Sequence, residues 1–141
     1  MERFDLVVIG GGPSGFAAVM RGLDFGKRVA LVEKAKVGGA GIFNGALSSK
    51  TLWEMSEAFL QTRQTNHGYT VHDCELSYPA VVNQMHRAVG EKHRQLREQL
   101  NYFRRSGHLS EYHGHGRLLD PHRIEITLET GGPEVIHAEH I

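Results

Sequence analysis

Apolar residues along the first quarter of the chain follow the pattern of a strand, a helix and a second strand. Residues 4–9 (FDLVVI) form a short run rich in β-branched side chains, typical of a fully buried parallel strand. Residues 16–26 have apolar positions at helical spacing, and Gly26 stands where a helix ends. Residues 28–33 (RVALVE) form a second apolar run. The pattern predicts a strand–helix–strand unit of the size expected for a right-handed parallel crossover.

Helical spacing returns after a glycine-rich loop over residues 37–45. It predicts one helix over 51–63, with Ser49 as its N-cap, and a longer helix over about 79–105. Gly90 weakens the middle of the longer helix, where a kink or break is an alternative. Trp53 and Tyr102 lie on these helices, and we interpret them as core or domain-contact aromatics.

The last part of the chain has a period of two and predicts three short strands, over residues 108–120, 122–130 and 134–141. Glycines 131 and 132 and Pro133 mark the turn before the last strand. The predicted fold class is therefore α/β, a Rossmann-like doubly wound parallel sheet with flanking helices. A helical pair and a small antiparallel β meander complete it.

Composition and charge narrow the function classes. The 141 residues are enough for one domain, and 16 basic residues balance 16 acidic ones. Zero net charge favours neither nucleic acid nor an anionic membrane surface as partner. The single cysteine, Cys74, excludes an internal disulfide and indicates a reducing compartment. No signal peptide or membrane span is recognisable, so we expect a cytoplasmic protein.

Three glycines between the first predicted strand and helix form the pattern GxGxxG. Gly10 permits a tight turn, Gly12 permits close approach of the backbone to a pyrophosphate, and Gly15 permits close packing of helix and strand. Pro13 and Ser14 lie at the helix start, where free N–H groups and the helix dipole favour an anion. This context predicts a dinucleotide-binding loop.

Glu33 ends the second predicted strand, where an acid accepts hydrogen bonds from a ribose hydroxyl and repels a 2′-phosphate. FAD and NAD both fit such a unit, so the fingerprint alone does not choose between them. His113 and His115 would share one face of a strand, but no third ligand has metal-site spacing. The sequence therefore predicts no metal site.

Three segments, DLVVIGGGPSGFAA, VALVEK and VGGAGIFNGALSSK, resemble the N-terminal FAD-binding part of the pyridine nucleotide–disulfide oxidoreductases. The resemblance covers most of the chain and is strongest over residues 4–53. It implies FAD as the cofactor and NAD(P)H as co-substrate of the full-length enzyme. The cofactor-binding residues that the motifs and the resemblance together indicate are Gly10, Gly12, Pro13, Ser14, Gly15, Glu33, Lys34, Gly38, Gly39, Lys50, His115 and Gly116.

The resemblance fails at the redox-active cysteines. Family members carry a cysteine pair after the paired glycines, and here those two positions are Gly41 and Ala46. Without the thiols, electrons from reduced flavin cannot pass to a disulfide substrate. The expected catalytic residues are therefore absent from this chain, whereas Lys50 is expected near the flavin ring.

The resemblance leaves several functions open. The leading interpretation is the FAD-binding portion of a flavin-dependent NAD(P)H oxidoreductase with a non-disulfide acceptor, similar to soluble pyridine nucleotide transhydrogenase. The alternatives are a non-catalytic FAD- or nucleotide-binding module, a dihydrolipoamide dehydrogenase-like protein that has lost disulfide chemistry, and direct NAD binding.

The resemblance also bears on domain organisation. Residues 1–141 are expected to form a single, partial FAD-binding domain that is inactive alone. The NAD(P)-binding and dimerisation domains of the family are expected outside it, and the full-length form is expected to be a homodimer. A half-finished sheet would leave an exposed edge.

Overall fold

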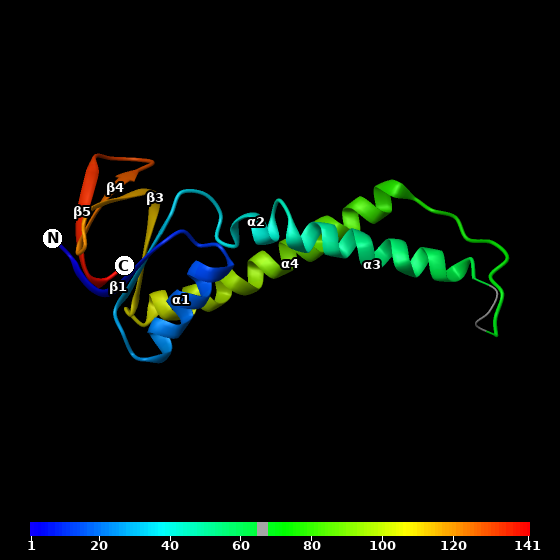
Figure 1. Cartoon of the computed structure of the whole chain (residues 1–141), viewed down its shortest axis with the longest axis horizontal. Coiled ribbons are helices and arrows are strands. Elements are labelled where there is room, and N and C mark those ends of the chain that lie inside the picture. The colour runs from blue at the N-terminus through cyan, green and yellow to red at the C-terminus, as the bar shows by residue number, and fades with distance from the viewer. Residues whose placement is uncertain (65–67) are drawn as a thin grey trace. The chain divides into compact units, whose positions relative to one another are not determined.

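The computed structural model describes residues 1–64 and 68–141 (Figure 1). The chain divides into two compact units. We call Met1–Gly39 together with His93–Ile141 the sheet unit, and Ala40–Lys92 the helical unit. None of the helices within the described ranges is both long enough and apolar enough to cross a membrane.

The predicted strand–helix–strand unit is confirmed in the sheet unit. Strand β1 (Arg3–Ile9) leads into helix α1 (Pro13–Asp24), which leads into strand β2 (Val29–Glu33). β1 and β2 pair in parallel, and their register runs from Leu6↔Val29 to Ile9↔Val32. Helix α1 ends as predicted, because Gly26 has φ of +67° and its N–H donates to Leu23 O at 2.9 Å.

The predicted meander is also confirmed. Strands β3 (Leu109–Asp120), β4 (Arg123–Leu128) and β5 (Pro133–His140) pair antiparallel in sequence order, and β3 pairs in parallel with β2. The expectation of an exposed sheet edge is wrong for β1, because β5 also pairs in parallel with β1 through Arg3↔His137 and Phe4↔Ala138. The five strands therefore close on themselves in the order β1-β2-β3-β4-β5.

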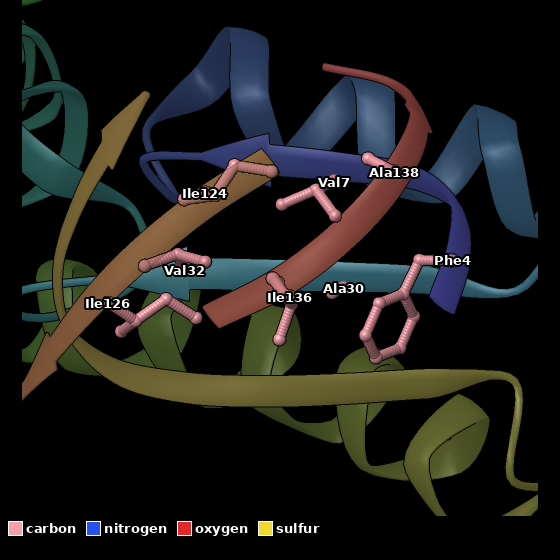
Figure 2. Packing of buried hydrophobic residues seen from close by; sticks show 8 residues of the cluster. All are labelled: Phe4, Val7, Ala30, Val32, Ile124, Ile126, Ile136 and Ala138. Atoms are coloured by element: carbon pink, nitrogen blue, oxygen red, sulfur yellow. The ribbon is translucent and has the colours of Figure 1, made fainter. Parts of the chain in front are cut away.

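The closed strands enclose a compact apolar core. Figure 2 shows side chains from β1, β2, β4 and β5 filling the space between those strands. Phe4 packs edge-on against the half-buried Tyr112 of β3, with 6.2 Å between the ring centroids. The cluster consists of Phe4, Val7, Ala30, Val32, Ile124, Ile126, Ile136 and Ala138. Burying these branched side chains fixes the register of four strands, because a one-residue slip would turn each of them outward.

The helical unit contains most of a short helix α2 (Gly39–Ile42), helix α3 (Ala46–Thr62) and the first half of helix α4 (Tyr78–Arg105). The predicted start of α3 is wrong. Gly45 is the N-cap, and the hydroxyl of Ser49, already inside the helix, donates to Gly45 O at 2.9 Å. Helix α4 continues without a break through Gly90.

The core alternative for Trp53 and Tyr102 is wrong, and their placement at a contact between domains stays a prediction. Their relative exposures are 66% and 69%, so neither belongs to a core of this chain. The buried residues of α4 are Leu96 and Leu100, which belong to the half of the helix in the sheet unit. In that half, Arg97 forms an ion pair with the almost fully buried Glu111 of β3 at 2.5 Å.

Candidate functional site

Two positions of the loop after β1, Gly10 and Gly15, require glycine for different reasons. Gly10 has φ of +100°, a conformation that side-chain-bearing residues rarely adopt, and its N–H donates to Val32 O at 2.8 Å. A Cβ atom on Gly15 would lie 1.8 Å from Gly10 O. The first glycine thus turns the chain, and the third allows helix α1 to begin directly against that turn.

The N-terminus of α1 is open toward an anion. Its N-cap is Gly12, which makes no side-chain cap hydrogen bond, and its first turn contains Pro13 and no acidic residue. The first N–H groups of a helix have no partner within the helix, and the helix dipole places positive partial charge there. Ser14 is exposed in this turn. The arrangement can bind a phosphate or pyrophosphate group.

The carboxylate of Glu33 is fixed at the end of β2 by two backbone N–H groups. Its Oε2 accepts a hydrogen bond from the N–H of Gly11 at 2.5 Å, and its Oε1 accepts one from Ala35 at 2.7 Å. Sequence reasoning identified Glu33 as a ligand acceptor but missed these two contacts. Glu33 therefore links the end of β2 to the glycine loop through contacts within the protein alone.

A pocket of about 200 Å³ lies where β1, β2 and β3 end or bend, and it includes five of the residues singled out from the sequence. Gly116 lies close to its apolar wall, since a Cβ there would meet Val32 Cγ1 at 3.2 Å and Ile9 Cγ2 at 3.3 Å. Sequence reasoning did not identify the apolar residues Ile9 and Val32 of this wall. The lining consists of Ile9, Gly10, Val32, Glu33, Lys34, Gly114, His115 and Gly116.

The paired glycines Gly38 and Gly39 lie against the same loop. Both have positive φ, and Gly38 N–H donates to Gly11 O at 2.7 Å. A Cβ on Gly39 would lie 3.3 Å from the Cα of Gly12. The segment after β2 therefore packs its backbone directly on the GxGxxG loop, which explains why small residues occur here.

Lys50 and the two cysteine-equivalent positions belong to the helical unit, whereas the residues that line the pocket belong to the sheet unit. Gly41 lies in α2, Ala46 is the first residue of α3, and Lys50 is exposed in α3. Cys74 is exposed, and its Sγ lies 3.5 Å from Thr62 Oγ1. Gly41 and Ala46, the two cysteine-equivalent positions, carry no thiol.

Histidines do not assemble a metal site in the described parts of the chain. His113 and His115 are both exposed on β3. Within residues 1–64 and 68–141, no group of three or more His, Cys, Asp or Glu side chains is placed to share a metal ion. The pocket thus offers backbone N–H groups, one fixed carboxylate, one lysine and an apolar wall.

Comparison with known proteins gives one consistent result. A family model described as pyridine nucleotide-disulphide oxidoreductase matches residues 4–136. Dihydrolipoyl dehydrogenase from Chlamydia muridarum is 33% identical over 99% of this chain and 29% of its own length. Soluble pyridine nucleotide transhydrogenase from Hahella chejuensis is 30% identical over 99% of this chain and 30% of its own length. The chain therefore spans under a third of these curated relatives.

A solved structure shares the fold. The Cu(II) complex of the HOCl-induced flavoprotein disulfide reductase RclA from Escherichia coli aligns with a TM-score of 0.75 at 19% sequence identity. The alignment covers 98% of this chain and 27% of that one. At this level of identity, the likeness establishes the arrangement of strands and helices.

Proposed function

The chain belongs to the pyridine nucleotide-disulphide oxidoreductase family, and on that premise we propose that it is the FAD-binding portion of a flavin-dependent NAD(P)H oxidoreductase. The observation that carries the proposal is the pocket beside the glycine loop, where Gly10, the fixed carboxylate of Glu33 and Gly116 meet. The pocket offers backbone N–H groups for a pyrophosphate, and a carboxylate and an apolar wall for an adenosine.

The residues present fit FAD in three respects. The uncapped N-terminus of α1 would bind the pyrophosphate through backbone N–H groups, next to Gly12. Glu33 accepts hydrogen bonds from a ribose, and its charge disfavours a 2′-phosphate. Gly116, close to Val32 and Ile9, lines the wall that His115 and Lys34 border, where the adenine would lie.

FAD, when bound, supplies the capacity to take a hydride from a nicotinamide and to pass electrons on. The chain's own residues would hold and orient it, with Gly38 and Gly39 supporting the loop. The resemblance implies that Lys50 would supply a cation to the flavin ring. Gly41 and Ala46 stand where a thiol pair would be needed for disulfide chemistry. We therefore propose a non-disulfide acceptor, as in transhydrogenase-type hydride transfer between nicotinamides.

A second candidate function also rests on Gly41 and Ala46, the two positions that lack the family's cysteines. If the sulfurs were lost together with catalysis, the chain would be a non-catalytic FAD- or nucleotide-binding module with the scaffold retained. The resemblance further supports two proposals about the longer protein, namely that it forms a homodimer and that it is cytoplasmic.

The visible absorbance spectrum tests the proposed cofactor. The purified chain is incubated with FAD and desalted, and retained flavin is identified by chromatography after denaturation. We expect a flavin spectrum and release of FAD. A folded chain that retains no flavin, both alone and within a longer reading frame, would contradict the proposal.

Rapid mixing with NADH then separates the enzyme from the module. We expect the flavin of a longer protein that includes this chain to be bleached by NADH or NADPH and to be reoxidised by a nicotinamide analogue. Flavin that binds but stays oxidised with both nucleotides would support the non-catalytic module instead.

A further inference from the structure

A row of basic side chains crosses three strands on the outer face of the closed sheet. His137 of β5 pairs with Arg3 of β1 on one side and with Arg123 of β4 on the other. The neighbours of His137 along β5, Ile136 and Ala138, point into the core (Figure 2), so His137 itself faces outward. Directly paired residues share one face of a sheet, and we call Arg3, His137 and Arg123 the basic row.

Ion pairs compensate only part of the charge of the basic row. Nε of Arg123 donates to Asp120 Oδ2 at 2.5 Å, whereas Arg3 forms no ion pair within residues 1–64 and 68–141. Arg3 is exposed, and the Arg123 side chain is 53% exposed. Like charges at opposed positions of a sheet repel each other. The basic row therefore carries an excess of positive charge that a bound anion would offset.

The nearby acidic side chains on neighbouring positions have other partners or lie farther away. Glu2 pairs with Arg28 at 2.6 Å, and Glu125 pairs with Arg117 at 2.9 Å. Glu139 lies on the same side two residues farther along β5, a spacing of about 7 Å on an extended strand. The basic row is therefore not neutralised from within the described parts of the chain.

Two stacked histidines lie beside the arginines. The rings of His122 and His137 are 5.8 Å apart between centroids, with 11° between their planes. Nδ1 of His122 donates to Ala138 O at 3.0 Å, since a carbonyl oxygen only accepts. Nδ1 of His137 is buried without a partner, and its cross-strand neighbours are cations, which favours a lone pair there and the proton on Nε2. The Nε2–H of His137 is then the donor that an outside group can reach.

We propose that the basic row binds a phosphate group, with Arg3 and Arg123 on either side and the Nε2–H of His137 between them. Guanidinium groups bind phosphate oxygens through paired, charge-assisted hydrogen bonds. Donors from three neighbouring strands suit a tetrahedral anion with several acceptor oxygens better than a planar carboxylate, which a single arginine satisfies.

This site is separate from the pocket proposed for FAD. Arg3 is the first residue of β1, whereas Ile9, which lines that pocket, is the last. The strand between them spans about 20 Å. Phosphate binding at the basic row does not depend on FAD binding, and either can fail without the other.

NMR titration of the full chain with inorganic phosphate tests the site, with pH held constant and ionic strength matched by chloride. We expect the ring signals of His122 and His137 to shift in a saturable manner, whereas those of His86 on α4 should not move. The glycine loop is itself proposed to bind phosphate groups, so this local signal, rather than total phosphate bound, is the relevant measurement.

Arg3→Gln should raise the Kd for phosphate at this site by about tenfold or more, because it removes a charged donor. The Arg3 side chain makes no hydrogen bond or ion pair in the described residues, so the variant should fold, which circular dichroism checks. Arg117→Gln is the matched control, since it removes an equal charge from β3 and should leave the Kd unchanged. Glu139→Gln removes a nearby negative charge and should lower the Kd.

Glycerol 3-phosphate, as a second titrant, identifies the source of the phosphate group. Tighter binding than that of inorganic phosphate would assign an esterified phosphate, and weaker binding would assign the free ion. The proposal is overturned if the signals of His122 and His137 respond to phosphate no more than to chloride at equal ionic strength. It is also overturned if Arg3→Gln binds phosphate like the unmodified chain.

Discussion

The N–H of Gly11 donates to the carboxylate of Glu33 across the end of the parallel β1–β2 pair, at 2.5 Å. The contact joins the middle of the GxGxxG loop to the residue proposed to bind a ribose. A carboxylate with two backbone donors is restrained in position. Glu33 therefore has two separable roles, one in holding the loop and one in meeting the ligand.

Replacement of Glu33 should reveal both roles. Glu33→Ala leaves the N–H groups of Gly11 and Ala35 without their acceptor, so we expect the melting temperature of the ligand-free chain to fall. FAD affinity should drop by about tenfold or more, as expected when a charged hydrogen-bond acceptor is lost. Fluorescence titration with FAD and thermal unfolding measure the two effects.

Glu33→Gln serves as the matched variant, because its amide oxygen can still accept one hydrogen bond. It should retain more stability than Glu33→Ala. An alanine variant that melts and binds FAD like the unmodified chain would contradict the assigned role.

Two glycines of the loop should respond differently to alanine. Gly15→Ala places a Cβ 1.8 Å from Gly10 O, so the loop or α1 must move, at a cost of about 1–3 kcal/mol. A Cβ on Gly12 meets nothing within 4 Å, and its φ of −69° suits alanine. We expect Gly12→Ala to keep the stability of the chain and to lose FAD affinity, whereas Gly15→Ala loses both.

Chemical denaturation and FAD titration of the two variants provide the measurement. If Gly12→Ala bound FAD with unchanged affinity, the pyrophosphate would not lie against that glycine.

The ion pair between Arg97 and Glu111 should contribute more to stability than the pair between Arg117 and Glu125. The Glu111 side chain is 7% exposed, whereas Arg117 is 64% exposed. Arg97→Ala leaves a carboxylate buried without its partner and should cost about 3 kcal/mol. Arg117→Ala should cost less than about 1 kcal/mol. Urea denaturation of both variants measures the loss in the free energy of unfolding. Equal losses in the two variants would contradict the expected difference.

Tyr112 should ionise at a higher pH than a tyrosine that is free in solution. Burial, and then the nearby charges of Glu2 and Glu134, raise the pKa of Tyr112 to about 12, against the opposing effect of Arg28. A raised folded-state pKa means that the folded chain holds this proton more tightly than the unfolded chain. Stability is therefore fully present below pH 10 and falls as the pH rises toward 12.

Absorbance of the phenolate in a pH titration measures this effect. We expect a phase near pH 12, which Tyr112→Phe removes. A titration curve that Tyr112→Phe leaves unchanged near pH 12 would contradict the expectation.

The local elements were predictable because they depend on neighbouring residues. The buried run of β2, the glycine at 26 and the period-two pattern of β3 to β5 each carry their own signal. The start of α3 was not predictable in the same way. Ser49 is a favoured N-cap residue, but the glycine at 45 lets the helix begin earlier and brings Ser49 inside it.

Contacts between distant residues were not predictable from the pattern. The pairing of Arg3 with His137 depends on how the meander returns, and no local signal specifies it. The contact of Glu33 with Gly11 required knowledge of how closely the loop approaches β2. By contrast, Gly10, Glu33 and Gly116, which were singled out from the sequence, line one pocket, because the carboxyl ends of parallel strands meet at one edge of a sheet. Their role in cofactor binding stays a prediction.

Closure of the strands has a consequence for how the chain forms during synthesis. β1 leaves the ribosome first, but its partner β5 lies at the other end of the sequence. The core residues of β1 therefore stay incompletely covered until β4 and β5 have emerged, and the search for such distant pairing is slow. A nascent chain halted before β5 would expose Phe4 and Val7 and should be a preferred target for chaperones.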